Sequence, residues 1–112
     1  MIVVHSLNEV IASAPAKVIL FGEHFVVYGE PAIVLAIDKR AYASVKTRRD
    51  SKIYINSIDL GVSGYFERNR FVAERGGQNA ELKLKPIKTA VQKVLERIRR
   101  NVGVNVEIRS SI

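Results

Sequence analysis

The alternation of apolar and polar residues predicts strands through the first half of the chain. Short runs rich in β-branched residues, separated by Pro and Gly, predict strands near Val10–Ala14, Lys17–Phe21, Ile33–Ile37 and Tyr42–Arg48. The run 32–37 is apolar at every position, so we expect it in the middle of a sheet with cover on both faces. The segment 42–48 becomes polar towards its end and is expected to emerge at an edge.

The next segment, Lys52–Asn56, alternates with Ile53 and Ile55 on one face. Together with the preceding strand it predicts a hairpin that turns at residues 49–51. Residues 61–78 contain several glycines and solvated charges, which predict a long connection with little regular structure.

The second half predicts one helix and a final strand. The helix is expected to start at Pro86, because proline suits a first helical turn, and to end near Arg100–Asn101. One helical face carries apolar residues at helical spacing, namely Ile87, Ala90, Val91, Val94, Leu95 and Ile98. Residues 104–108 then alternate as in a half-buried strand. The pattern indicates a single α+β domain spanning residues 1–112.

The composition narrows the class of protein. Hydrophobic residues make up 47% and charged residues 26% of 112 residues, which is typical of a folded globular domain. The chain has no cysteine, which excludes disulfides and thiolate metal sites, and its two histidines do not suggest a metal site. No apolar run approaches the roughly 18 residues of a membrane span. We therefore expect a cytoplasmic protein without a membrane partner.

A formal net charge of +7 favours anionic partners in general. Many of the cations fall on or beside the expected helix, where a solvated helix face is the ordinary interpretation and a nucleic-acid surface the alternative.

The stretch KVILFGEHFVVYG, residues 17–29, interrupts two apolar runs with Gly-Glu-His. Lys17 begins a strand, and Glu23 and His24 follow Gly22 at the end of that strand. Three ionisable groups in apolar surroundings cost desolvation free energy unless they are paired or functional. The structural alternative to a functional site is that the Lys17 ammonium reaches solvent while Glu23 and His24 satisfy backbone groups at a turn.

The longer stretch ASAPAKVILFGEHFVVYG, residues 12–29, resembles the first signature of the GHMP kinases, a superfamily of small-molecule kinases, in the form seen in mevalonate kinases. The resemblance implies a fold like the second domain of ribosomal protein S5, a mixed or antiparallel sheet with a packed helix. It implies phosphoryl transfer from ATP, with Mg²⁺, to the primary hydroxyl of mevalonate in isoprenoid biosynthesis.

The resemblance also assigns roles to individual residues. Lys17 would be catalytic and substrate-binding, its ammonium offsetting charge near the substrate hydroxyl. Glu23 and His24 would line the acceptor pocket. Asp59 falls where relatives carry a residue near the nucleotide.

The second signature of these kinases, a glycine-rich phosphate loop, does not follow the strand that ends near residues 110–112. We therefore expect an N-terminal piece of a kinase, truncated before that loop and the catalytic aspartate and inactive alone. Its uncovered apolar surface predicts self-association.

Two alternatives remain open. One is another kinase of the superfamily, acting on phosphomevalonate or a sugar, because pocket residues decide specificity. The other is a basic RNA-binding module of the same fold, against which the scarcity of aromatic residues argues.

Overall fold

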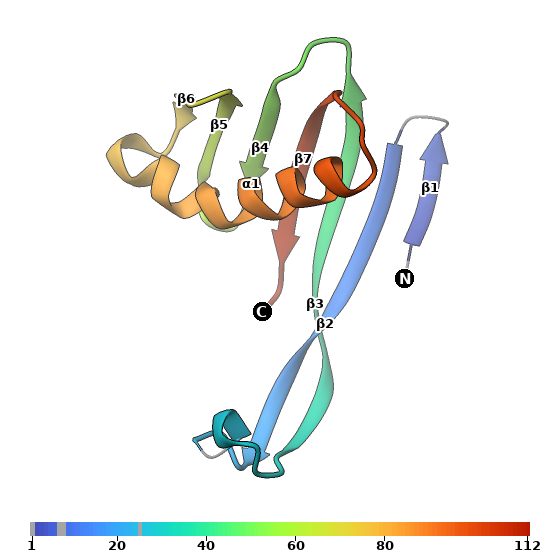
Figure 1. Ribbon diagram of the computed structural model, residues 1–112, viewed down its shortest axis with the longest axis vertical. Helices are drawn as coiled ribbons and strands as arrows, with labels where there is room; N and C mark the ends of the chain where they lie inside the picture. The colour runs from blue at the N-terminus through green and yellow to red at the C-terminus, as the bar shows by residue number, and fades with distance from the viewer. Residues whose placement is uncertain (1, 7–8, 25) are drawn as a thin grey trace.

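The computed structural model describes residues 2–6, 9–24 and 26–112. They form a mixed sheet of seven strands in the order β1-β2-β3-β7-β4-β5-β6 with one long helix, α1, lying across one face (Figure 1). The strands are β1 Ile2–Ser6, β2 Glu9–Phe21, β3 Ile33–Arg48, β4 Ile53–Ser57, β5 Val62–Glu67, β6 Arg70–Arg75 and β7 Gly103–Ser110. Helix α1 spans Ala80–Arg97, and two short 3-10 turns are η1 Val26–Tyr28 and η2 Gly77–Asn79. The expected α+β fold, a mixed sheet with one packed helix, is confirmed.

The hydrophobic core lies between α1 and the half of the sheet formed by β4, β5 and β7. Ala80 and Leu84 of the helix are fully buried there. The remaining members of the core come from the sheet and are Ile55, Val62, Phe66, Val104 and Val106. None of these core residues comes from β2 or β3, so the core lies at the end of the sheet that α1 crosses (Figure 1).

The last strand enters the middle of the sheet. Strand β7 pairs antiparallel with β3 and parallel with β4, so it separates these two strands. The predicted hairpin at residues 49–51 is therefore wrong: the strands it would join are both present, but neither pairs with the other. Local alternation identifies a strand but not its partner, and here the partner comes from the far end of the chain.

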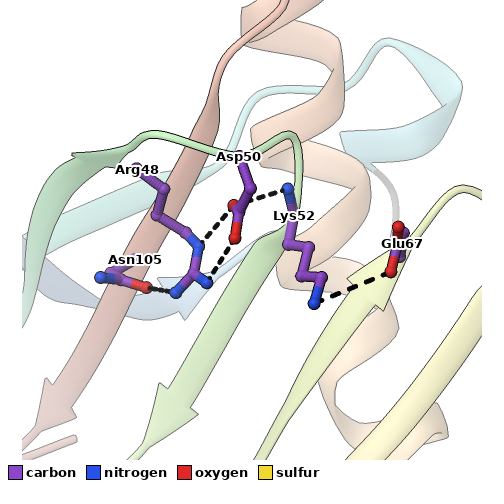
Figure 2. Close-up of polar contacts among 5 residues, drawn as sticks. All are labelled: Arg48, Asp50, Lys52, Glu67 and Asn105. Carbon is purple, nitrogen blue, oxygen red and sulfur yellow. Dashed lines mark hydrogen bonds and ion pairs between the residues drawn. The ribbon is translucent and has the colours of Figure 1, made fainter.

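The loop of residues 49–52 crosses the start of β7, and a polar network holds it there (Figure 2). The Arg48 guanidinium donates to both carboxylate oxygens of Asp50, at 2.8 and 2.7 Å, and to Oδ1 of Asn105 on β7 at 2.6 Å. Asp50 also accepts the backbone N–H of Lys52, whose ammonium lies 3.9 Å from Glu67. The pKa of Asp50 is held far below its usual range, first by the Arg48 hydrogen bonds and then by the Lys52 N–H.

Gly103 fits directly beneath this loop. Its N–H donates to the Asp50 carbonyl at 2.8 Å, and the next residue, Val104, donates to the Lys52 carbonyl at 3.0 Å. A Cβ on Gly103 would lie only 2.5 Å from both carbonyl oxygens. The close passage of two backbones therefore requires glycine at this position.

Three further expectations about the sheet are wrong. The segments near Val10–Ala14 and Lys17–Phe21 form a single strand, β2, with an irregularity between Pro15 and Ala16. Residues 33–37 of β3 are exposed and pair only with β2, so they are not covered on both faces. Residues 42–48 lie between β2 and β7 rather than at an edge.

Residues 61–78 contain the β5–β6 hairpin rather than an irregular connection. Gly64, which suggests a turn in the sequence, lies inside β5, where a Cβ would come 2.5 Å from the Phe71 ring. Helix α1 likewise begins before the expected start, since Pro86 lies within it, and it ends at Arg97. The final strand, predicted over 104–108, is confirmed as β7.

Candidate functional site

The expected site lies on an arm of the sheet. The distal parts of β2 and β3, up to Phe21 and from Ile33, extend away from the helix-covered body as a two-stranded hairpin (Figure 1). Cross-strand partners share a face of a hairpin. Val18 opposite Leu35 and Ile19 opposite Val34 therefore place apolar side chains on both faces. The arm is thus apolar on each side without being buried on either.

The arm folds back at its tip through a glycine turn. Gly22 has φ 92, and a Cβ there would lie 2.7 Å from the Pro31 carbonyl oxygen. The Val26 N–H donates to the Gly22 carbonyl at 3.0 Å, which closes the turn that leads into η1. The break in the apolar pattern at Gly-Glu-His therefore marks the end of a strand, as the sequence predicts.

Glu23 and His24 lie together on this turn. The Nε2 atom of His24 is 3.8 Å from Oε1 of Glu23, and their side chains are 86% and 62% exposed. Within this chain, both side chains are largely open to solvent. The imidazole and the carboxylate can therefore each form a hydrogen bond with a polar ligand at the tip.

Lys17 lies further down the arm, on β2 opposite Ala36 of β3. It is exposed and precedes the end of β2 by about 13 Å at 3.3 Å per residue. Alternation places it on the same face as Ile19. The ammonium therefore stands on an apolar face of the arm, near but not at the tip that carries Glu23 and His24.

Asp59 lies elsewhere. Its carboxylate accepts the backbone N–H of Ser110, at the end of β7, and the Gly61 N–H donates to the Ile58 carbonyl to close the same turn. Ser110 is opposite Ala41 on β3, roughly 17 Å along the strand from the position facing Lys17. The structure thus brings Glu23 and His24 together, keeps Lys17 on their arm, and places Asp59 at the body.

Sequence reasoning did not single out Arg40, which lies at the base of the arm. Its guanidinium donates to Ser13 Oγ at 3.2 and 3.1 Å, and its backbone N–H donates to Ser111 Oγ at 3.2 Å. The residue joins β2, β3 and the segment after β7 where the arm leaves the body. The partners are distant in sequence, so no local spacing could have indicated them.

A large apolar hollow of about 690 Å³ lies against the C-terminal half of α1 and not on the arm. Its walls come from α1, β3 and β7 and include Val45, Val94, Leu95 and Val104. None of Lys17, Glu23, His24 and Asp59 lines it.

No protein-family model matches the chain. Curated relatives do: a mevalonate kinase of Pyrococcus furiosus is 45% identical over 108 residues, which cover 93% of this chain and 32% of that enzyme. One of Thermococcus sibiricus is 40% identical over 107 residues with the same coverage. The chain therefore spans about a third of the length of the relatives it matches.

Solved structures agree with the sequence comparison. The crystal structure of the Methanococcus jannaschii mevalonate kinase superposes with a TM-score of 0.65 at 30% identity, over 91% of this chain and 32% of that one. A second mevalonate kinase structure gives a TM-score of 0.58 at 28% identity. By sequence and by fold, the chain is a homologue of mevalonate kinases over about one third of their length.

Proposed function

We propose that this chain forms the acceptor-binding part of an ATP-dependent mevalonate kinase. The observation that supports the proposal is the 45% identity over 93% of the chain, together with the Lys17, Glu23 and His24 signature on one exposed arm. The activity itself belongs to enzymes about three times as long. The remaining parts of the catalyst would come from polypeptide outside these 112 residues.

In the proposed reaction the primary hydroxyl oxygen of mevalonate forms a bond to the γ-phosphorus of ATP. The bond from that phosphorus to the β–γ bridging oxygen breaks, and ADP leaves. The hydroxyl proton passes to a base outside this chain. Lys17 would stabilise the negative charge that develops on the attacking oxygen, and Glu23 and His24 would hold the polar end of the acceptor by hydrogen bonds.

The described residues fit the nucleotide and its metal only in part. Asp59 has an anionic carboxylate already engaged by the Ser110 N–H, which suits a ribose hydroxyl better than a phosphate. Within the ranges that the structure describes, no three carboxylate or histidine side chains gather as a metal site would require. We therefore propose that Mg²⁺ and the phosphates of ATP are held outside this chain.

The proposal also covers partners and location. No helix in the described part of the chain is long and apolar enough to cross a membrane. Mevalonate would be the small-molecule partner, in isoprenoid biosynthesis in the cytoplasm. The exposed apolar arm supports self-association of the isolated chain, since both faces lack cover.

A chimera tests the function. This chain would replace the matching third of the Pyrococcus furiosus enzyme, and ATP-dependent phosphorylation of mevalonate would be measured by ADP release. We expect activity in the chimera and a kcat lower by about 10²–10³ on Lys17→Ala, the size typical of removing one charge-stabilising group. Lys39→Ala, another exposed lysine of the same hairpin, is the matched control and should leave kcat unchanged.

Two results would contradict the proposal. A folded chimera that phosphorylates phosphomevalonate or a sugar in preference to mevalonate would favour another GHMP kinase. A chimera whose kcat is unaffected by Lys17→Ala would remove Lys17 from the reaction.

His24→Ala should act mainly on KM for mevalonate and leave KM for ATP unchanged.

A further inference from the structure

A second hollow, of about 420 Å³, lies beside the C-terminal end of α1, on the opposite side of the helix from the apolar hollow. It lies where the C-terminal half of α1, the start of β4 and the β5–β6 turn meet. One acidic residue, Glu96, and four cationic residues line it. The cationic residues are Arg68, Lys88, Arg99 and Arg100. Val102 also lines it, so it lies at the opposite end of β7 from Ser110 and Asp59. The hollow is therefore separate from the position at which the nucleotide is expected.

At two positions that line the hollow, the backbone has a conformation that suits glycine better than the arginine found there. Arg68 and Arg99 have φ 54 and φ 55 and are the non-glycine residues with positive φ in the described ranges. Arg68 lies in the tight turn between β5 and β6, and Arg99 follows the end of α1. Both are positions at which glycine or asparagine normally relieves the left-handed conformation. Both disfavoured arginines line the same hollow, which points to a use for their side chains.

Local structure does not account for these cations. Among the residues described, no ion pair joins any of the four to a carboxylate; the neighbouring Glu67 lies instead against Lys52. The last carbonyls of α1 already accept backbone N–H groups, from Ile98 at 3.0 Å and Arg99 at 3.2 Å. Guanidinium groups are therefore not required to cap the helix. Lys88 is half-buried with its ammonium 5.9 Å from the centroid of the buried Phe66 ring.

We propose that this hollow binds a small ligand carrying two or three linked phosphate groups. Its volume is in the range of small-molecule sites. Arginine binds phosphate oxygens in a bidentate manner, and four cations against one carboxylate leave a local excess of three positive charges. A compact polyphosphate fits a concave site of this size better than a nucleic-acid backbone, which requires an extended surface.

The test is calorimetric titration of the intact chain with inorganic tripolyphosphate at low, fixed ionic strength. We expect saturable binding with one ligand per chain. Arg68→Gly and Arg99→Gly should each weaken it about tenfold, the size typical of one charge-assisted hydrogen bond. The same substitutions should leave the melting temperature unchanged or raise it, because glycine suits a positive φ. Weaker binding without loss of stability is a pair of effects that a purely structural arginine would not produce.

Matched controls remove a charge outside the hollow: Arg70→Ala on β6 and Lys83→Ala on α1, both exposed. If they weaken binding as much as the two glycine variants, the interaction is general attraction to a basic protein and the proposal fails. It also fails if tripolyphosphate does not saturate, or if a single-stranded RNA oligomer binds more tightly and displaces it. Activity of the kinase chimera does not enter this test, so the two proposals can fail independently.

Discussion

Replacing Gly103 by alanine tests the crossing of the 49–52 loop over β7. The new Cβ would lie 2.5 Å from the carbonyl oxygens of Asp50 and Lys52 and 2.8 Å from the Lys52 nitrogen. Because the obstructing atoms are backbone, the loop has to move as a unit. That movement would break the two hydrogen bonds from Gly103 and Val104 and disturb the Arg48–Asp50 pair.

The expected loss follows from these contacts. Overpacking costs about 1–3 kcal/mol, and two backbone hydrogen bonds contribute about 1 kcal/mol each. Alanine also gives the unfolded chain less conformational entropy than glycine does, which offsets about 0.4–1 kcal/mol of that loss. The free energy of unfolding should therefore fall by about 2–4.6 kcal/mol. With a urea dependence of about 2 kcal/mol per molar, the unfolding midpoint should drop by roughly 1–2 M.

The assay is urea unfolding followed by circular dichroism, with Gly61→Ala as the control. Gly61 has φ 67, and a Cβ added there would meet no atom within 4 Å, so alanine at this position adds backbone strain without a clash. That variant should lose about 1–2 kcal/mol. If Gly103→Ala is as stable as the wild type, or loses no more than the control, the two backbones are not as close as described and the reasoning is refuted.

The remaining predictions concern the core, the loop and the arm. Leu84→Ala should cost about 2–5 kcal/mol in urea unfolding because Leu84 is fully buried, whereas Leu82→Ala on the same helix, 71% exposed, should cost under about 1 kcal/mol; equal losses would contradict the assigned helix face. The pKa of Asp50 is depressed in the folded chain, so its stabilising contribution is complete above an unfolded pKa near 3.9 and is lost as the pH falls below it. The urea concentration at the unfolding midpoint should therefore be lower at pH 3 than at pH 6, and this difference should be smaller in Asp50→Asn. An identical difference in both proteins would exclude Asp50 as the cause of the pH dependence. Light scattering after size exclusion should give a mass above 12.5 kDa, reduced by Tyr28→Ser at the arm tip, where Tyr28 is 80% exposed; a wild-type monomer would contradict self-association.

Local sequence pattern predicted the existence of several elements but not how they pair. The β7 alternation at 104–108 was sufficient to identify a strand, because one face is buried against α1. The same pattern could not show that β7 would displace β4 from β3, since register and partner depend on distant residues. Gly64 and Pro86 misled for a related reason: each follows a local rule for turns or helix starts that tertiary packing overrides.

The arm shows a different limit. The apolar run at 32–37 was interpreted as a strand covered on both sides, and its composition does suit such a place, yet this chain leaves residues 33–37 exposed. The end of the strand at Gly22, by contrast, was predictable, because a charged triplet after glycine breaks the apolar pattern. The positions of Glu23 and His24 followed from that break, but the distance of Asp59 from them required the sheet order.

The central position of β7 has a consequence for synthesis. A chain growing on the ribosome releases β3 and β4 long before Gly103–Ser110, so their facing edges stay unpaired until the last strand emerges. An open slot flanked by two strand edges can accept the corresponding strand of another nascent copy. We therefore expect strand-swapped dimers as a misassembly of this topology, and prompt emergence of β7 after β4 would limit them.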